Sequence, residues 1–439
     1  MLRDALAVAI EALSWMAYEG IGERSALLRA SQQLNITSPS DLREAHKWVM
    51  ETSRFQNRLD WFILQVAPEE LMKDASHGIR SLLRILAYVR FIESKPASVL
   101  ERIVGVSRQT IGWRELRPYE ESIARLVSSS PNFYLGHTQE FERVSLETCH
   151  PIWYVKRLIV TFGRSLALTI LKRDLSTVAT FARVNELRGE NRTSFDEQLH
   201  SSQVKGVENV YALDKGGRAD ARAKLASSGE IVIQDLGSIV AGLVTAPRPG
   251  QVVLDVCASP GNKTSHLAAQ MGNDGEIYSV EISVSRSLQW RREMTRTGCR
   301  IATLIMADAR KLPIRIQADV VLVDPPCSNS GVFARDPTSK WRLTPARLKE
   351  LVRAQGEILQ EASDHLSEGG TLVYCTCSIL PEENELVVEA FLKKNPKYTL
   401  TRQTPFLGCP GLRGLSDCQR FFSHLHNCNG YFIAKMRKQ

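Results

Sequence analysis

The sequence predicts an α/β protein whose C-terminal half is a doubly wound parallel sheet, preceded by a small α/β region and an all-α domain. The chain has 439 residues, which is too long for a single core. Apolar residues recur at helical spacing up to residue 130, whereas buried strands alternate with helical stretches from about residue 245. We therefore expect domains at 1–130, 151–240 and 241–439, with a linker at 131–150.

The N-terminal domain is predicted to be a helical bundle, because strand-like alternation is scarce there. Ser40 is a candidate N-cap, with Glu44 in the turn that follows. Two of the apolar series with helical spacing are Leu59, Phe62, Ile63 and Val66, and Ile79, Leu82, Leu83 and Leu86.

The middle of the chain mixes both patterns. Residues 128–151 are polar and contain Gly and Pro, which is typical of a linker. A helical segment follows from Trp153 to Leu171, and then the strand-like stretch TFARVNEL at 180–187. A further helical pattern precedes GEIVIQDLGS at 229–238, so we expect a small mixed α/β subdomain.

Five buried strands are predicted in the last domain, and several of them end in a chemically active side chain. The carboxyl ends of parallel strands meet at one edge of a sheet, where ligands bind. The polar and sulfur-bearing groups at these ends should therefore line a single crevice. The predicted strands are 251–257, 276–282, 302–308, 319–326 and 370–376, and the residues at their ends are Asp255 to Cys257, Glu281, Asp308, Asp324 and Cys377.

The overall charge suggests a polyanionic partner, since the formal net charge is +8 and the pI is near 9.0. Residues 1–130 hold 17 Lys and Arg against 16 Asp and Glu, so almost all of the excess lies later. It includes the stretches 285–300 and 335–349, the second of which alternates basic residues with Trp341. That mixture suits RNA phosphates beside a stacked base, and it equally suits a solvated face.

The expected compartment is the cytoplasm. No apolar run approaches the ~20 residues of a membrane span, and the N-terminal stretch carries Asp4 and Glu11, which fits an amphipathic helix better than a signal peptide. Nine cysteines without an export signal are most simply reduced thiols. We expect no membrane association and, by default, a monomer.

A methyl-donor site is predicted around the first strand of the sheet. The strand runs into DVCASPGNKT, a turn that brings backbone N–H groups close to a ligand but lacks the G-x-G-x-x-G and P-loop patterns. Glu281 lies twenty residues beyond Gly261, where an acid accepts hydrogen bonds from ribose hydroxyls, and Asp308 is placed to bind adenine. An adenosine-bearing ligand without pyrophosphate fits, and S-adenosylmethionine is the obvious one. Each acid alone could instead cap a helix.

Two cysteines are candidates for catalysis. DPPC places Asp324 and Cys327 on a proline-fixed turn, and TCS places Cys377 at the end of the fifth strand. A zinc site is the first alternative, but C-x-C is a poor match to zinc-ligand spacing, so we expect no metal. Inert burial is the second alternative. It is the preferred interpretation for five other cysteines, namely Cys299, Cys375, Cys409, Cys418 and Cys428.

One reaction needs this combination of groups. C5 of cytosine is too weak a nucleophile to attack a methyl sulfonium, but a thiolate added to C6 converts the ring into an enamine that can. A carboxyl group near N3 stabilises the charge on the ring, and a base then removes the C5 proton. Cys377, Asp324 and Cys327 could supply these three functions.

The chain resembles the Nop/Sun (Fmu-like) family of S-adenosylmethionine-dependent RNA (cytosine-5)-methyltransferases from about His150 to the C-terminus. The order of DPPC before TCS distinguishes this family from base methylases that carry DPP followed by an aromatic residue. The matching segments are HPIWYVKRLI, RVNEL, GEIVIQDLGS, DVCASPGNKT, DPPCSNSGV, YCTCSILPEEN and NGYFIAKMRK.

The resemblance implies a Rossmann-like methyltransferase domain at 241–439 and an RRM-like subdomain at 151–240. The helical pattern, length and position of residues 1–130 are similar to the NusB-like RNA-binding module of bacterial members. The resemblance further implies that Cys377 attacks C6, that Cys327 is needed for product release, and that Lys263 lies near the reacting centre. The donor would be surrounded by Cys257, Ala258, Ser259, Pro260, Gly261, Asn262, Lys263, Glu281, Arg286, Asp308 and Asp324.

Two positions depart from the family pattern. Asn262 stands where the family usually has glycine, and Asn329-Ser330 stand where it usually reads Gly-Thr. Asparagine tolerates left-handed backbone better than most residues, so we expect little conformational effect.

The leading hypothesis is formation of 5-methylcytosine in RNA, with salt-dependent binding and a target base that is unpaired or flipped out. The NusB-like module favours ribosomal over transfer RNA, although binding modules are reused freely. A non-catalytic RNA-binding or assembly factor is the rival from another class, and the intact Asp324, Cys327 and Cys377 argue against it. Methylation of an adenine amino group needs no thiol and would leave both cysteines unexplained.

Overall fold

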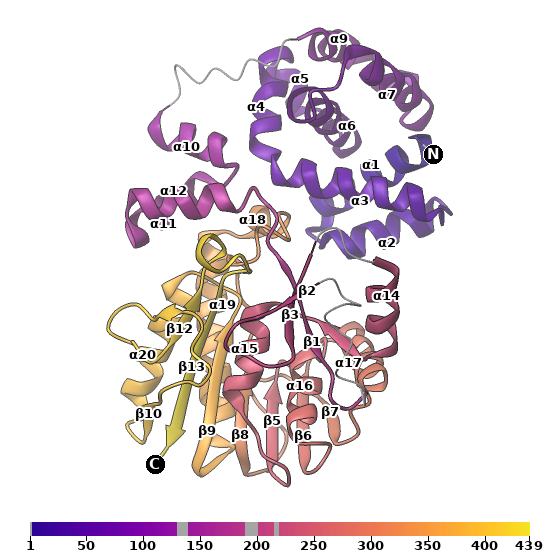
Figure 1. Cartoon of the computed structure of the whole chain (residues 1–439). Coiled ribbons are helices and arrows are strands. Elements are labelled where there is room, and N and C mark those ends of the chain that lie inside the picture. The colour runs from indigo at the N-terminus through magenta and orange to yellow at the C-terminus, as the bar shows by residue number, and fades with distance from the viewer. Residues whose placement is uncertain (1, 130–138, 189–200, 215–218) are drawn as a thin grey trace. The chain divides into compact units, whose positions relative to one another are not determined.

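The computed structural model describes residues 2–129, 139–188, 201–214 and 219–439. The chain divides into two compact units (Figure 1). The N-terminal unit comprises Met1–Leu175 and Asp336–Arg342, and the C-terminal unit comprises Ser176–Arg335 and Leu343–Gln439. No helix in the described part of the chain is long and apolar enough to cross a membrane.

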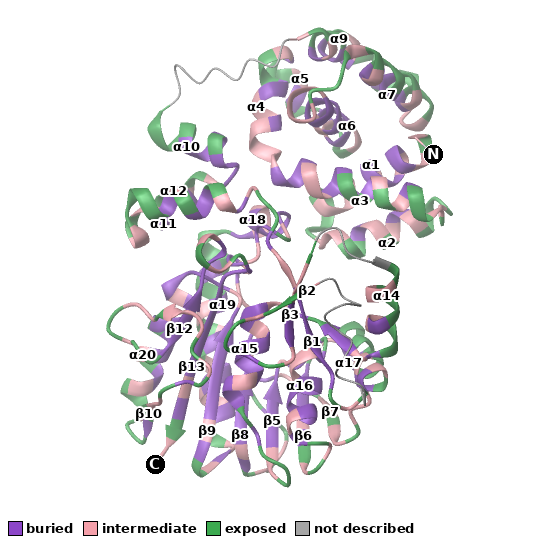
Figure 2. Cartoon of the chain, in the orientation of Figure 1, coloured by how far each residue is buried: buried purple, intermediate pink, exposed green. Residues whose placement is uncertain are grey.

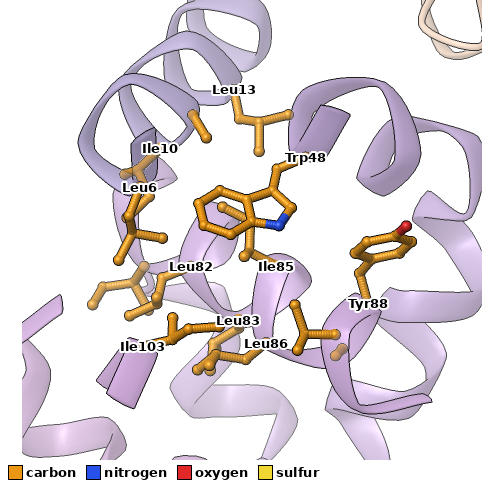
Figure 3. Packing of buried hydrophobic residues seen from close by; sticks show 14 of the residues in the cluster. Leu6, Ile10, Leu13, Trp48, Leu82, Leu83, Ile85, Leu86, Tyr88 and Ile103 are labelled. Carbon is orange, nitrogen blue, oxygen red and sulfur yellow. The ribbon is translucent and has the colours of Figure 1, made fainter. Parts of the chain in front are cut away.

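The N-terminal unit is helical, as its apolar spacing predicts. Trp48 lies at the centre of a buried cluster to which several helices contribute, including Leu6, Ile10 and Leu82 (Figure 3). The helices are α1 (Leu2–Glu19), α2 (Glu23–Gln33), α3 (Pro39–Arg54), α4 (Gln56–Val66), α5 (Glu69–Lys73), α6 (His77–Ala87), α7 (Ala97–Thr110), α8 (Trp113–Leu116), α9 (Glu120–Ser128), α10 (Glu140–Thr148), α11 (Ile152–Phe162), α12 (Arg164–Arg173) and α18 (Ser339–Arg342).

Helix α3 begins two residues earlier than predicted. Ser38, rather than Ser40, is the N-cap, and its side chain accepts a hydrogen bond from the backbone N–H of Asp41. Pro39 occupies the first helical position, where a missing N–H costs nothing. The sequence Ser-Pro therefore marks the start of this helix.

The predicted linker at 131–150 is only partly a linker. Residues 131–138 lie outside the described part of the chain, but α10 occupies most of the remainder. This helix is fixed to α4, because Asn57 Nδ2 donates to Ser145 O at 2.9 Å and Arg58 Nε donates to Leu146 O at 2.9 Å. The N-terminal unit therefore extends to Leu175, and the helical segment expected at the start of the middle region belongs to it.

A short segment from the far half of the sequence, Asp336–Arg342, completes the N-terminal unit. Lys340 Nζ donates to Arg54 O at 2.8 Å, and Trp341 Nε1 donates to Ser53 O at 2.6 Å. These two carbonyl groups end α3, where helix hydrogen bonds have run out and a cation is favourable. Lys340 and Trp341 thus cap α3.

Lys340 fits neither interpretation of the stretch 335–349. RNA contact and a solvated face each require exposed basic residues, but Lys340 is only 1% exposed. The indole N–H of Trp341 is already bonded within the unit. The exposed basic residues of this stretch are Arg335, Arg347 and Lys349, and those of the stretch 285–300 include Arg291 and Arg292.

The C-terminal unit begins with a small antiparallel sheet in the order β2-β3-β1-β4. Its presence confirms the mixed α/β pattern expected for the middle region. The elements are β1 (Thr180–Val184), β2 (Ser201–Gln203), β3 (Val210–Leu213), α14 (Ala219–Ser228) and β4 (Ile231–Ile233).

The larger sheet has the order β11-β12-β13-β9-β8-β5-β6-β7, with β10 paired to β13. Strands β9, β8, β5, β6 and β7 are parallel, which confirms the five predicted strands. The strands are β5 (Val252–Val256), β6 (Glu276–Glu281), β7 (Ala302–Met306), β8 (Ala318–Val323), β9 (Leu366–Thr376), β10 (Tyr398–Leu400), β11 (Cys409–Pro410), β12 (Gln419–Phe421) and β13 (Tyr431–Lys438).

Helices cover both faces of this sheet, so its central strands are buried on both sides (Figure 2). Alternate residues of β5 pack on opposite faces of the sheet. Val253 packs towards α15 and α16, whereas Leu254 packs towards α19 and α20. This is the Rossmann-like, doubly wound arrangement that the sequence predicts. The helices are α15 (Leu236–Thr245), α16 (Asn262–Gln270), α17 (Val284–Thr297), α19 (Pro345–Asp364), α20 (Glu385–Lys394) and α21 (Ser423–His426).

Candidate active site

The site lies where the strand order reverses. The chain passes from β5 to β6 and β7 on one side, and then returns to β8 and β9 on the other (Figure 1). Side chains that follow β5 and β8 face the resulting crevice, which is the usual ligand position in such sheets. The turn after β5 starts at Cys257, and the loop after β8 starts at Asp324.

A cavity of about 200 Å³ opens beside the ends of β5, β6 and β7. The sequence predicts four of its lining residues as donor contacts, namely Cys257, Glu281, Arg286 and Asp308. The other wall comes from α19 and from Pro326, and no strand-end motif in the sequence indicates it. The α19 residues on that wall are Arg347, Glu350, Leu351, Ala354 and Ile358.

Glu281 is oriented for a ligand at the end of β6. It is 2% exposed, and its Oε1 accepts a hydrogen bond from Ser283 N at 2.9 Å. Its Oε2 is buried without a hydrogen-bond partner in the described structure, although Arg286 Nη1 lies 3.5 Å away. Arg286 is in turn held by Ser259, whose carbonyl oxygen accepts from Nη2 at 2.5 Å. The second carboxylate oxygen of Glu281 can therefore accept a hydrogen bond from a hydroxyl group of a ligand.

Asp308, which the sequence places as an adenine contact, is already hydrogen-bonded within the protein. Both of its carboxylate oxygens accept hydrogen bonds from Arg310, with Nη2 to Oδ2 at 2.6 Å. These hydrogen bonds from Arg310 lower the pKa of Asp308. The residue lines the cavity as a carboxylate paired with an arginine.

The turn between β5 and α16 lies beside the cavity, and only Cys257 of residues 257–263 lines it. Cys257 and Gly261 have left-handed backbone, with φ of 64° and 107°. An L side chain rarely adopts the φ of Gly261, and a Cβ there would also displace the end of Met294, whose Cε would lie 2.7 Å away, so glycine is favoured. Asn262 is the first residue of α16 and needs no left-handed backbone, which explains why it can replace glycine. Burial raises the pKa of Cys257, which keeps it a thiol.

Lys263 and Asp324 form a partly buried ion pair at the reversal point. Lys263 Nζ lies 2.6 Å from Asp324 Oδ2. Burial would lower the pKa of Lys263, but the nearby charge of Asp324 and their hydrogen bond outweigh burial and raise it. Behind this pair, Cys375 Sγ lies 3.8 Å from Asp324 Oδ1 and accepts from the Tyr431 hydroxyl at 3.4 Å. Lys263 is therefore cationic, with its charge fixed beside the carboxylate.

The two predicted catalytic cysteines meet at the same place. Cys327 Sγ and Cys377 Sγ are 3.1 Å apart, and Cys377 Sγ lies 2.9 Å from Asn329 Oδ1. The hydrogen bond with Cys377 and burial raise the pKa of Cys327 well above its usual value. This shift favours the neutral thiol form of Cys327. Asn329 has φ of 58°, as expected for asparagine in place of glycine.

Glu383 joins the two cysteine-bearing loops, and sequence analysis did not assign it a role. It is fully buried and accepts from Ser328 N at 2.7 Å and from Gln355 Nε2 at 2.9 Å. The hydroxyl groups of Ser328 and Ser378 also donate to its Oε2. Its position in PEEN, just after the strand that carries TCS, was the available signal.

Four of the other cysteines have surroundings that suit inert thiols. Burial raises the pKa of Cys375, Cys418 and Cys428, and raises that of Cys299 to about 11. Cys409 Sγ lies 3.9 Å from His426 Nε2 at the edge of the sheet. The described residues contain no group of three or more His, Cys, Asp or Glu side chains that could hold a metal ion.

Comparison with known proteins places these features in a family. The family model described as 16S rRNA methyltransferase RsmB/F matches residues 242–437. The probable ribosomal RNA small subunit methyltransferase B of Bacillus subtilis is 30% identical over 314 residues, which are 68% of each chain. The ribosomal RNA small subunit methyltransferase B of Escherichia coli is 26% identical over 450 residues, covering 100% of this chain and 99% of that one.

A second kind of relative matches part of this chain. The tRNA (cytosine(72)-C(5))-methyltransferase of Pyrococcus horikoshii is 37% identical over 217 residues, which are 49% of this chain and 54% of that one. The solved structure of NSun6 from Pyrococcus horikoshii with SFG is 25% identical, with a TM-score of 0.58 over 65% of this chain and 97% of that one.

The fold of the whole chain also has a solved counterpart. The crystal structure of PH0851 is 24% identical, with a TM-score of 0.82 over 99% of both chains. Together with the motifs and the paired cysteines, these similarities confirm the Nop/Sun resemblance. The chain belongs to the RsmB/F family of RNA methyltransferases.

Proposed function

We propose that this enzyme methylates C5 of a cytosine in RNA through a transient bond between Cys377 Sγ and C6 of the base. The observation that carries this proposal is the 3.1 Å contact between the Cys327 and Cys377 sulfurs. A methylase acting on an exocyclic amine has no use for two adjoining thiols. Cytosine C5 chemistry uses one thiol to add to the ring and a second group to remove a proton.

The methyl donor is S-adenosylmethionine. When bound, it supplies the electrophilic methyl group that becomes attached to C5. The cavity beside β5, β6 and β7 fits this ligand, since the unpartnered Oε2 of Glu281 can accept a ribose hydroxyl. The apolar side chains of Ile282, Leu351 and Ile358 can cover the adenine ring. SFG, an analogue of this donor, occupies the solved NSun6 relative.

The Lys263–Asp324 pair prepares the ring for attack. Asp324 lies in the loop that also carries Cys327, and it can bind the N3 side of a cytosine placed over the sulfurs. Lys263 keeps a positive charge next to that carboxyl group. The Lys263 cation thereby stabilises the negative charge that develops on the ring when Cys377 adds to C6, and the Asp324 carboxylate can accept a hydrogen bond from the amino group next to N3.

The contact between the two sulfurs determines where each proton goes during the reaction. Once Cys377 has lost its proton to water and before it attacks, Cys327 donates its S–H to the Cys377 thiolate. Once Cys377 is bonded to C6, that thiolate no longer exists, and the largest cause of the raised pKa of Cys327 is gone. Cys327 then loses its proton to water and takes the proton from C5. Cys377 leaves as a thiolate, and one proton is released per turnover.

We propose ribosomal RNA of the small subunit as the substrate, rather than transfer RNA. The relative that aligns with the whole of this chain is a ribosomal RNA methyltransferase, whereas the tRNA methyltransferase aligns with about half of it. Residues 1–130 would serve as a NusB-like RNA-binding module, and β1 to β4 with α14 as an RRM-like subdomain. Exposed Arg291 and Arg292 on α17 are available for phosphate contact.

Bisulfite sequencing of total RNA from a strain that lacks this protein tests the proposal. We expect one protected cytosine in small-subunit ribosomal RNA to become convertible, and expression of the intact protein to restore its protection. Loss of protection of a cytosine in a transfer RNA would support methylation at C5 and would contradict ribosomal RNA as the substrate. Unchanged protection of every cytosine would overturn both.

A further inference from the structure

The turn that carries Asn329 is held rigidly against the end of β9. Gly331 N donates to Cys377 O at 2.9 Å, and Ser330 Oγ lies 2.8 Å from Ser378 Oγ. Within the turn, Val332 N donates to Asn329 O at 2.9 Å. The direction of the Asn329 side chain is therefore set by the backbone on both sides of it.

The carboxamide of Asn329 lies against the reacting sulfurs. Its Oδ1 is 2.9 Å from Cys377 Sγ and 3.7 Å from Cys327 Sγ. A thiol can donate only to the carbonyl end of an amide, whereas a thiolate accepts from its NH₂ end. An asparagine can make both hydrogen bonds in turn by rotating its terminal torsion angle.

The left-handed backbone alone does not account for this residue. Glycine adopts φ near 58° without steric cost, and the family that the sequence resembles usually has glycine at this position. Asparagine tolerates the conformation but gains nothing from it compared with glycine. The contact with Cys377 is what its side chain adds.

We propose that Asn329 is a positioning residue for Cys377, an inference that rests on the proposed function. In the resting enzyme its side-chain carbonyl accepts the S–H of Cys377 and fixes the sulfur beside Cys327. When Cys377 loses its proton to water, the amide turns and its NH₂ group donates to the thiolate. The sulfur is thereby held in one orientation until it adds to C6.

Two substitutions distinguish the contribution of the Asn329 side chain from that of its left-handed backbone conformation. Asn329→Gly keeps the left-handed turn and removes the amide. Asn329→Asp keeps the shape and the acceptor, but it cannot donate to a thiolate and repels its charge. Both variants are compared with the unaltered protein by thermal melting followed with circular dichroism, so that a loosened turn is recognised.

The first measurement is alkylation of Cys377 by iodoacetamide in the absence of RNA, followed by peptide mass spectrometry. The second is the single-turnover rate of the covalent RNA adduct in a Cys327→Ala background. For Asn329→Gly we expect alkylation about threefold faster, because the thiol is released, and adduct formation about three- to tenfold slower. For Asn329→Asp we expect both rates to fall about tenfold or more.

Opposite effects of glycine and aspartate on alkylation would not arise from a loosened turn, which would expose the sulfur in both variants. Unchanged rates for Asn329→Gly in both measurements would overturn the inference, since only the backbone would then matter. Faster alkylation in both variants would overturn it as well. Absence of any RNA adduct in the Cys327→Ala protein with Asn329 intact would overturn the proposed function instead, and the alkylation rates would still test the contact.

Discussion

The sulfur atoms of Cys327 and Cys377 lie 3.1 Å apart, although 50 residues separate them in the chain. Their approach depends on a close crossing of two backbone segments. Gly331 N donates to Cys377 O at 2.9 Å, and Gly430 N donates to Gly331 O at 2.7 Å. The loop after β8 is thus pinned between the end of β9 and the start of β13.

Gly331→Ala should separate the two sulfurs. A Cβ at this position would overlap the carbonyl oxygen of Gly430 and lie 2.8 Å from Cys377 O. Because both neighbours are backbone, the loop has to move, and displacement of reacting groups by about 1 Å can cost roughly 100-fold in rate. We expect methylation to fall about 10- to 100-fold.

The matched control is Gly356→Ala, in helix α19. Nothing lies within 4 Å of a Cβ added there, and alanine favours a helix by about 1 kcal/mol over glycine. Its methylation rate should be unchanged, and its thermal stability should rise slightly. Equal activity of the two variants in an RNA methylation assay would refute the pinned-loop account.

Glu383→Gln should weaken the hydrogen bonds that link the two cysteine-bearing loops. The buried carboxylate accepts hydrogen bonds from Ser328, Ser378 and Gln355, and bonds to a charged group contribute about 1.5–3 kcal/mol each. We expect the free energy of unfolding to fall by about 2 kcal/mol and methylation to fall about tenfold. Glu389→Gln is the control, since its ion pair with Arg413 is exposed and should contribute little. Urea titration and initial rates check both.

Glu281→Gln should weaken donor binding specifically. The buried Oε2 is replaced by an amide or by a weaker neutral acceptor, and loss of a charged hydrogen bond weakens binding about 10- to 100-fold. Titration calorimetry with S-adenosylmethionine measures the effect. Glu276→Gln, at the opposite end of the same strand, should bind the donor as the unaltered protein does. Comparable losses in both variants would show that Glu281 acts through the fold and not through the ligand.

Lys340→Met should change how stability depends on pH. Burial lowers the pKa of Lys340 to about 8, below the ~10.4 of an unfolded lysine. Between these values the folded protein holds the neutral amine while the unfolded chain still binds the proton, so the stability of the lysine form rises with pH. Relative to Lys340→Met, we expect a gain of about 2–3 kcal/mol from pH 8 to 10.

Thermal or urea denaturation of both proteins across this range measures that gain. If the difference in unfolding free energy between the two proteins does not change with pH, the carbonyl groups of Ser53 and Arg54, at the end of α3, keep Lys340 charged after folding.

The sequence predicted those parts of the site that lie at strand ends. Asp324, Cys327 and Cys377 could be placed because a parallel sheet brings such ends together, whatever the loops do. The five parallel strands followed from their apolar runs. In contrast, the short strands β10, β11 and β12 carry two or three residues each, which is too few for a pattern.

Features that depend on contacts between distant segments could not be predicted. Nothing local in PEEN shows that Glu383 accepts hydrogen bonds from a loop 55 residues earlier. The burial of Lys340 could not be predicted for the same reason, since its partner, Arg54, lies 286 residues away in the sequence. Charge patterns describe composition, and only the fold decides which charges are exposed.

The most direct test is to incubate the Cys327→Ala protein with its RNA and S-adenosylmethionine, and to map the cross-linked peptide by mass spectrometry. Without Cys327 the C5 proton cannot leave, so we expect RNA to accumulate on the peptide that contains Cys377, and Cys377→Ala to give neither adduct nor product. Adduct on another cysteine, or full turnover by the Cys377→Ala protein, would contradict the account.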